Sequence, residues 1–394
     1  MDLLSAAEKF SASDHFLIKF SASSCLHSLN KLASCEACFA VCPTAAIQPG
    51  KPPAFNAQAC VACRACLQAC PVGAFSGEDQ AKHLLGSVAR AVEKHKVNQI
   101  DLLCHRHTAP AQGPVDSQLG LRVPGCLAQL GVGAYLGLAV LGIEKVTVRL
   151  DDCAQCAWGM LKPQIIEQVG QAVALLNTWE KSAEIGLLEV LDAQNLRERP
   201  GWNADSPPLS RAELLRPATL LNQAKYEQLI SPDPLAVRRH HLSLDRYRQT
   251  IAVNHLLAEE QPAGAHLTAP VNYVQARVND ACIGCNICSQ ACPTGAIRRT
   301  VLDENEFRLG FSPLICVSCG VCAALCPEDA LTLESSAPAG YLLEGTILLH
   351  SGSLVKCQRC NTLFSPKAGE KLCPSCQFRQ DHPFGSRLFK VKPG

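Results

Sequence analysis

The chain contains two copies of one short motif, CIGCNICSQACP at residues 282–293 and CVSCGVCAALCP at residues 316–327. Each copy has three cysteines separated by two residues, a spacing that lets one loop turn three thiolates toward the same iron–sulfur cluster. The fourth cysteine precedes a proline, which suits the first turn of a following helix, and it is expected to reach the cluster of the other copy. The motif thus predicts two [4Fe-4S] clusters with crossed ligand sets. One set is Cys282, Cys285, Cys288 and Cys326, and the other is Cys292, Cys316, Cys319 and Cys322.

In all eight cysteines and both prolines this stretch resembles the bacterial two-cluster ferredoxins. The resemblance implies a small electron-transfer module with low-potential clusters. A pair of zinc knuckles is the alternative, but zinc needs only four ligands per site and gives no reason for the crossed cysteine–proline pattern.

A second ferredoxin-like module with one irregularity lies near the N-terminus. Its second half is regular, and the crossed pattern predicts a [4Fe-4S] cluster on Cys42, Cys60, Cys63 and Cys66. In the first half, Leu32 stands where the leading cysteine is expected. Cys25, on a longer loop, is our preferred fourth ligand for the other cluster, beside Cys35, Cys38 and Cys70. A [3Fe-4S] cluster or a non-cysteine ligand at this position remains open.

Strand-like and helix-like segments alternate from residue 82 to residue 180. Short apolar runs at 100–103, 121–123 and 146–150 are separated by helical patterns, a succession that predicts a parallel sheet. The remaining cysteines of this part follow those runs, and the carboxyl ends of parallel strands meet at one edge, where open α/β sheets bind ligands. We therefore predict a metal site on Cys104, Cys126, Cys153 and Cys156.

This block is similar to the delta subunit of methyl-viologen-reducing hydrogenases and their heterodisulfide-reductase partners. The residues that carry the similarity are Leu103-Cys104, Val123-Pro124-Gly125-Cys126, Leu141-Gly142-Ile143 and Asp152-Cys153-x2-Cys156. The similarity implies a [2Fe-2S] cluster that passes electrons between subunits, and the close spacing of the last pair leaves [4Fe-4S] open. Buried core cysteines are the alternative. His105 and His107 raise the idea of a Rieske centre, but the matching Cys-x2-His half is missing.

Two further cysteine pairs lie close to the C-terminus. Cys357, Cys360, Cys373 and Cys376 have the spacing of a zinc ribbon, in which four thiolates close a tetrahedral site. Mononuclear iron of the rubredoxin kind would use the same geometry. Asn361 and Gln377 stand where the rubredoxin pattern has glycine, which favours zinc. With this site, all 24 cysteines of the chain are assigned.

These motifs predict a multidomain α+β and α/β protein. Two ferredoxin-like modules, a central parallel α/β domain, a helical tether and a small C-terminal zinc ribbon are expected. The ferredoxin-like modules are predicted at 1–80 and 276–338. The α/β domain is predicted at 81–194, the tether at 195–275 and the zinc ribbon at 339–394.

Composition narrows the environment and the partners. The chain has 36 basic and 35 acidic side chains, a balance that argues against nucleic acid as a partner. The N-terminus has no signal-peptide pattern, and thiols in metal-ligand spacing suit a reducing cytoplasm. The 21 uncharged residues from Val123 to Ile143 could mimic a membrane span, but their glycines and flanking strands favour a buried helix. Membrane association is therefore expected only through partners.

No catalytic residue is predicted. The chain has no Gly-x-Gly-x-x-Gly after a strand, no phosphate-binding loop and no Cys-x3-Cys-x2-Cys of radical SAM enzymes. We expect an electron-transfer subunit of a cytoplasmic, anaerobic oxidoreductase complex. Its expected partners are molybdenum, flavin, hydrogenase or heterodisulfide-reductase-like subunits and a soluble ferredoxin. The alternatives are a reductase with its own substrate site at the α/β cluster, and an assembly or scaffold factor that acts through the ribbon.

Overall fold

A computed structural model describes residues 18–177, 183–190, 193–208, 223–233, 237, 242–259, 270–302, 305–366 and 369–382. The chain divides into two compact units. The first comprises Met1–Lys31, Cys35–Val271 and Pro338–Leu343, and the second comprises Leu32–Ser34, Asn272–Ala337 and Glu344–Gly394. Parts of the predicted tether, including 209–222 and 260–269, lie outside the described residues.

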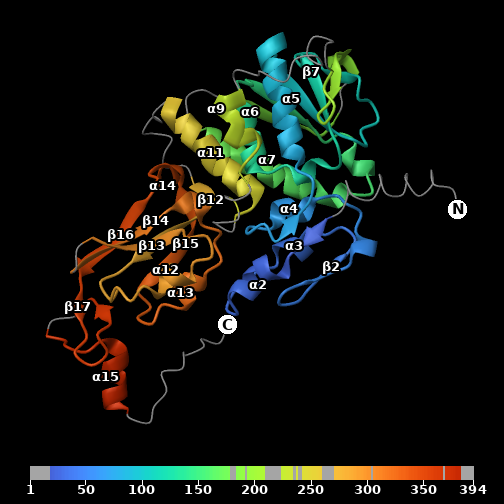
Figure 1. Cartoon of the computed structure of the whole chain (residues 1–394). Coiled ribbons are helices and arrows are strands. Elements are labelled where there is room, and N and C mark those ends of the chain that lie inside the picture. The colour runs from blue at the N-terminus through green and yellow to red at the C-terminus, as the bar shows by residue number, and fades with distance from the viewer. Residues whose placement is uncertain are drawn as a thin grey trace. The chain divides into compact units, whose positions relative to one another are not determined.

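The N-terminal part of the first unit consists of short helices and strands joined by loops (Figure 1). Strand β1 (Lys19–Phe20) pairs antiparallel with β4 (Phe75–Ser76), and β2 (Ile47–Gln48) with β3 (Ala54–Phe55). The short helices are α2 (Leu26–Leu29), α3 (Ala37–Ala40) and α4 (Ala65–Ala69). Stacked rings of Phe20 and Phe75, with centroids 4.7 Å apart, supply aromatic packing to this small module.

A five-stranded sheet forms the centre of the first unit, as the alternating segments predicted. The strands are β5 (Gln99–Cys104), β7 (Leu119–Val123), β8 (Lys145–Arg149), β9 (Glu184–Leu188) and β11 (Gly201–Asn203). Their order is β11-β7-β5-β8-β9, and each neighbouring pair is parallel. A small antiparallel pair, β6 (Gln112–Pro114) with β10 (Leu196–Glu198), lies outside this sheet. The carboxyl ends of β5, β7 and β8 therefore lie side by side.

Helices α5 (Gln80–His95) and α7 (Lys162–Leu176) contact strands of the sheet, β7 and β9 respectively, and α6 (Val132–Val140) contacts both helices. Helix α6 is buried from Val132 to Leu138, as the prediction of a buried helix in the uncharged stretch requires. None of the helices in the described part of the chain combines the length and the apolar character needed to cross a bilayer.

The segment predicted as a tether contributes helices α9 (Gln223–Ile230) and α11 (Leu244–Glu259). Helix α11 packs against α6, and its Asp245 accepts hydrogen bonds from the backbone N–H groups of Gly133 (3.0 Å) and Ala134 (3.1 Å) at the start of α6. Its Arg248 pairs with Asp79, the N-cap residue of α5. Helix α11 thus joins the first turns of two helices of the α/β layer.

A buried ion-pair network holds the middle strands of the sheet together. Asp101 of β5 has no exposed side-chain surface, and it accepts a hydrogen bond from Arg199 Nε at 2.6 Å and one from Ser117 Oγ at 2.5 Å. Arg149, at the end of β8 and equally buried, lies 3.6 Å from the same carboxylate. The Arg199 guanidinium passes over Gly120 of β7, where a Cβ atom would lie 1.9 Å from its Cζ. Only glycine leaves room for this pair.

In the second unit, the ferredoxin-like loops adjoin strands from both sides of the motif. Strand β12 (Pro270–Val278) pairs with β15 (Leu331–Pro338), and β13 (Ile297–Val301), β14 (Glu306–Phe311) and β16 (Ile347–Ser353) form an antiparallel sheet. Helices α12 (Ile287–Ala291) and α13 (Val321–Ala324) contact each other. A hairpin of β17 (Val355–Lys356) and β18 (Leu363–Phe364) and helix α15 (Pro374–Asp381) follow, whereas helix α14 (Ala339–Leu343), which precedes β16 in the sequence, belongs to the first unit.

Candidate metal centres

The first group of thiols in the N-terminal module gathers around Cys38. Burial, and then the thiols of Cys70, Cys35 and Cys25, raise the pKa of Cys38 to about 12. Cys25 precedes α2, so the longer loop that the sequence left undecided brings its thiol to this group. The carbonyl of Cys35 accepts a hydrogen bond of 2.9 Å from His27 Nε2, and the N–H of Ala74 points at Cys70 Sγ at 3.2 Å. These bonds hold the loops around the four sulfurs.

The second group contains the three cysteines of the regular loop and Cys42 from the irregular half. Burial and then the thiols of Cys63, Cys60 and Cys42 raise the pKa of Cys66. Cys70, which directly follows the helix that carries Cys66, is among the neighbours of Cys38. The cysteines thus exchange partners between the halves, in the crossed arrangement of two-cluster ferredoxins.

The two groups of the second unit repeat the arrangement. Cys282, Cys285, Cys288 and Cys326 line one pocket, and burial followed by the other three thiols raises the pKa of Cys288 to about 12. Burial followed by the thiols of Cys316, Cys292 and Cys319 raises the pKa of Cys322. Four partly buried thiols that disfavour one another's ionisation are a poor arrangement by themselves. A bound cationic iron–sulfur core would reverse that electrostatic penalty, so the donor sets fit the clusters.

In all three regular loops, the residue after the second cysteine has left-handed backbone geometry. These residues are Gly320 (φ 71°), Asn286 (φ 69°) and Arg64 (φ 63°). Glycine has no Cβ to clash in this region and asparagine tolerates it, whereas other residues adopt it at a cost. Arg64 is the exception among the three. Its side chain is only 3 % exposed and forms an ion pair of 3.1 Å with Glu78.

The α/β site lies at the carboxyl edge of the sheet, on loops that follow β5, β7 and β8. Its four cysteines, Cys104, Cys126, Cys153 and Cys156, line one cavity of about 580 Å³. Burial raises the pKa of Cys126 to about 12 and that of Cys153 to about 11. Among the neighbouring thiols, Cys104 contributes most to both shifts. Cys63 is also among the thiols that act on Cys126, so this site adjoins the second N-terminal group. The four sulfurs could hold a [2Fe-2S] or a [4Fe-4S] cluster.

Behind the edge site lies a polar cluster that the sequence analysis did not identify. Ala109 donates its N–H to His107 Nδ1 at 3.2 Å, so His107 Nε2 carries the proton and donates to Asp151 Oδ2, also at 3.2 Å. Arg149 donates two further bonds to Asp151, at 2.8 and 2.7 Å. His107 therefore belongs to the support of the loop after Cys104, and its ring nitrogens are engaged away from a cluster. The arginines and aspartates carried no spacing signal that could have indicated this role.

Aromatic and cationic side chains lie at the rim of this cavity. The Arg106 guanidinium lies 4.4 Å from the ring centroid of Trp158, a cation–π contact, and the ring of His105 lies 6.2 Å from the same indole. Lys162, which also lines the cavity, pairs with Glu189 at 2.7 Å. The backbone N–H of Trp158 points at Cys156 Sγ at 3.4 Å.

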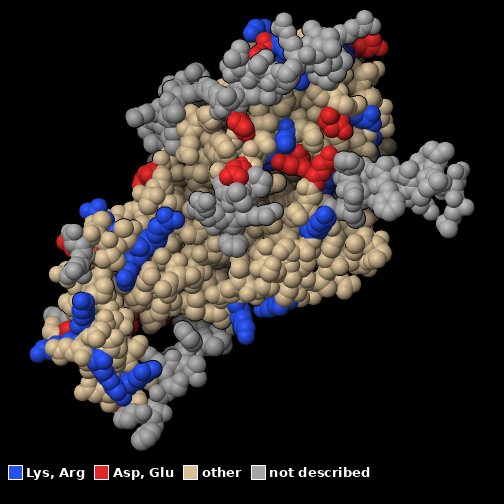
Figure 2. Space-filling model, in the orientation of Figure 1, with Lys and Arg blue, Asp and Glu red and all other residues tan. Residues whose placement is uncertain are grey.

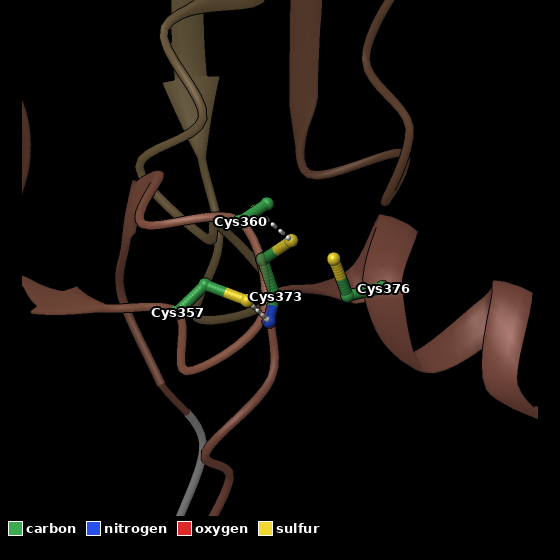
Figure 3. A group of neighbouring side chains, drawn as sticks. All are labelled: Cys357, Cys360, Cys373 and Cys376. Carbon is green, nitrogen blue, oxygen red and sulfur yellow. Dashed lines mark hydrogen bonds between the residues drawn. The ribbon is translucent and has the colours of Figure 1, made fainter.

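The C-terminal site is formed by the β17–β18 hairpin and the first turn of α15 (Figure 3). The sulfurs of Cys357, Cys360, Cys373 and Cys376 all lie within 4.8 Å of one another, and those of Cys360 and Cys373 are 3.6 Å apart. Four sulfurs held at about 2.3 Å from a tetrahedral metal ion lie about 3.8 Å apart. The preformed spacing therefore fits one zinc or iron ion. Phe364 and Leu372 pack against the cysteines and complete this small core.

Backbone N–H groups prepare two of these thiols for a metal. Although desolvation acts in the opposite direction, N–H groups of Cys373, Cys360 and Arg359 lower the pKa of Cys357 to about 6, and the hydroxyl and N–H of Thr362 lower the pKa of Cys360. Burial raises the pKa of Cys376 to about 12 and also raises that of Cys373. Asn361 stands where the rubredoxin pattern has glycine. Its φ is 58°, a left-handed conformation that asparagine tolerates.

Comparison with known proteins identifies the two ferredoxin-type regions. The family model of the 4Fe-4S dicluster domain matches residues 281–330, and that of the 4Fe-4S binding domain matches residues 53–76. No curated protein and no solved structure matches the chain. The chain therefore contains two 4Fe-4S ferredoxin-type domains, one in each unit, and their cysteine groups support the binding of [4Fe-4S] clusters.

Proposed function

We propose that this protein relays electrons through a series of iron–sulfur clusters between a donor and a catalytic partner. The ferredoxin-type domains support an iron–sulfur electron-transfer role. Three cysteine groups of the first unit are neighbours in space. The two N-terminal groups share their loops, because each receives one cysteine, Cys42 or Cys70, from the other half of the module, and Cys63 of the second group adjoins Cys126 of the third. This adjacency is the observation that carries the proposal. Electrons would pass from the N-terminal clusters to the edge of the parallel sheet.

The edge site is the proposed exit toward a partner subunit. It opens on the carboxyl edge of the sheet, and its rim carries Arg106 and Trp158 beside the cysteine loops. Hydrogenase, heterodisulfide-reductase-like, flavin or molybdenum subunits are the proposed partners, and a reduced ferredoxin is a proposed donor. The proposal includes an anaerobic, cytoplasmic setting and a zinc ion in the C-terminal site, which is supported by the closeness of its four sulfurs.

Stopped-flow reduction tests the relay. Anaerobic protein is mixed with reduced methyl viologen and then with an oxidised acceptor, while the visible absorbance of the clusters is followed. We expect Cys126→Ser to leave the ferredoxin clusters reducible and to slow their reoxidation by a partner-sized acceptor such as a flavoprotein. Reoxidation at the wild-type rate would show that the edge site is not on the path. A Cys360→Ser variant is the control, because its site lies outside the first unit.

A reductase with its own substrate site is the second candidate, and the size of the edge cavity favours it. At about 580 Å³, the cavity falls within the range of small-molecule sites. Arg106 and Lys162 would attract an anionic substrate to the cluster. A change in the spectrum of the edge cluster on addition of a small substrate would favour this function. Full turnover by Cys153→Ala would exclude it.

The assembly-factor alternative has one observation in its favour. Among the exposed charged side chains of the described residues from 355 to 382, the basic ones, Lys356, Arg359, Lys371 and Arg379, outnumber the acidic ones, Glu370 and Asp381 (Figure 2). An acidic protein surface would complement the basic side chains. Lys356→Glu combined with Arg359→Glu should then abolish capture of the partner without loss of iron. Unchanged capture by this variant would exclude the module as the docking surface.

A further inference from the structure

Arg64 occupies a backbone position that its counterparts give to glycine and asparagine. It follows the second cysteine of the Cys60–Cys66 loop with a φ of 63°, as Gly320 and Asn286 do in the other two regular loops. A residue with a Cβ atom has a conformational cost at this position that Gly320 avoids. The loop geometry itself does not require arginine, so the reason for it must lie in what the side chain contacts.

The guanidinium of Arg64 lies between the loops of two cysteine groups. It pairs with Glu78 at 3.1 Å on one side, and Nη1 lies 3.5 Å from Gln129 Oε1 on the other. Gln129 in turn donates from Nε2 to the carbonyl of Pro124 at 2.5 Å. A Cβ added at Gly125 would lie 3.4 Å from Arg64 Nη1, so the guanidinium is in contact with the loop that presents Cys126.

The same contact brings two protein segments together. Helix α4, which starts directly after Arg64 and carries Cys66, packs against the short 3₁₀-helix η3 (Leu127–Gln129), which starts directly after Cys126. Arg64 thus reaches from the backbone of one cysteine loop to the backbone of the next. Since it is 3 % exposed, its charge acts through protein and is weakly screened by solvent.

We propose that Arg64 is the positioning residue that couples the cluster on Cys42, Cys60, Cys63 and Cys66 to the edge site. It fixes the Pro124-Gly125-Cys126 loop against the Cys63 loop, and its positive charge stabilises the reduced, more negative state of both clusters. This inference rests on the proposed function, because it assigns a role in the relay to one side chain. Glu78 partly neutralises the charge of Arg64, and it leaves the contacts of Arg64 with the Cys126 loop in place.

Redox titration of the anaerobic full-length protein, followed by EPR, tests the proposal. In Arg64→Asn, which copies the residue of the Cys282–Cys288 loop, we expect the iron content to stay at the wild-type level. The midpoint potentials of the two adjoining clusters should fall, and the magnetic interaction between them in the fully reduced protein should weaken. Asn286→Gly is the matched control at the same loop position of the second unit, and the two adjoining clusters should keep their potentials in it.

A second variant makes the opposite prediction. Glu78→Gln removes a negative charge and leaves Arg64 in place, so the same two potentials should rise. Potentials and magnetic interaction that match wild type in both variants would overturn the proposal, as would equal shifts of every cluster in the chain. Failure of the proposed function looks different, because wild-type protein would then lack iron at the edge site. In that case only the cluster on Cys42, Cys60, Cys63 and Cys66 would report the effect of Arg64. An unchanged potential of this cluster would still overturn the proposal for Arg64.

Discussion

Replacing Asp101 by asparagine should destabilise the first unit strongly, because Asp101 is the carboxylate shared by two buried arginines. Its side chain is fully buried, Arg199 Nε lies 2.6 Å from one oxygen, and Arg149 lies 3.6 Å from the other. Removal of one partner from a buried ion pair costs about 3–5 kcal/mol, since the remaining charge stays buried without compensation. For a cooperative unit of this size, one kcal/mol lowers Tm by about 2–4 °C. We therefore expect Asp101→Asn to lower Tm by about 6–20 °C.

Asp116→Asn provides the matched control. Asp116 pairs with Lys145 at 2.6 Å, a contact as short as that of Asp101, but its side chain is 44 % exposed. Exposed pairs contribute about 0–1 kcal/mol, so this variant should change Tm by less than about 4 °C. The measurement is anaerobic thermal unfolding, followed by far-UV circular dichroism. Equal Tm values for the two variants would refute the argument that burial decides the strength of the Asp101 network.

Three further predictions concern the packing of the sheet and the metal sites. Gly120→Ala should lower Tm as Asp101→Asn does, because the new Cβ would meet the Arg199 guanidinium. Gly170→Ala, in a helix with nothing within 4 Å, should raise stability by up to about 1 kcal/mol, and similar Tm values for the two alanines would contradict this. Cys25→Ala should remove about one iron and give the oxidised EPR signal of a [3Fe-4S] cluster. Unchanged iron and EPR spectra would show that Cys25 is not a ligand. Zinc binding to metal-free protein should release fewer than four protons near pH 7, because backbone N–H groups lower the pKa of Cys357 to about 6 and leave this thiol largely ionised before zinc binds. Affinity should therefore rise with pH and fall more steeply below about pH 6, where Cys357 also becomes protonated. Calorimetry in buffers of different ionisation enthalpy counts these protons, and a release of four near pH 7 would be the contrary result.

Residue spacing carried most of the information about the metal centres. Ligands of one iron–sulfur cluster come from a short loop and one distant cysteine, so the pattern from Cys282 to Cys326 indicates the crossed sets directly. The strand-like runs before Cys104, Cys126 and Cys153 likewise predicted a parallel sheet, because buried strands of such sheets are nearly continuous apolar runs. The position of Cys25 could not be decided in this way, since the length of its loop is irregular.

The contacts that support the sites could not be read from spacing. Arg149 reaches Asp101 because β5 and β8 are neighbours, and Arg199, between β10 and β11, reaches the same carboxylate across Gly120 of β7. Helix α11 was expected in a tether, but Asp245 and Arg248 join it to the first turns of α6 and α5, which no local pattern indicates. In the sequence, Arg64 cannot be distinguished from any other loop arginine. Its proposed role depends on its left-handed backbone conformation and on its contact with Gln129, which only the structure shows.

The central claim is that the edge site holds a cluster in series with the ferredoxin clusters, and anaerobic metal analysis with EPR of the reduced protein tests it most directly. Four [4Fe-4S] clusters account for about 16 iron atoms, and the edge cluster adds two or four. We predict about 18–20 iron atoms and about one zinc ion per chain, with about two to four iron atoms lost in Cys153→Ser. About 16 iron atoms in wild type, unchanged in Cys153→Ser, would contradict the relay through the sheet edge.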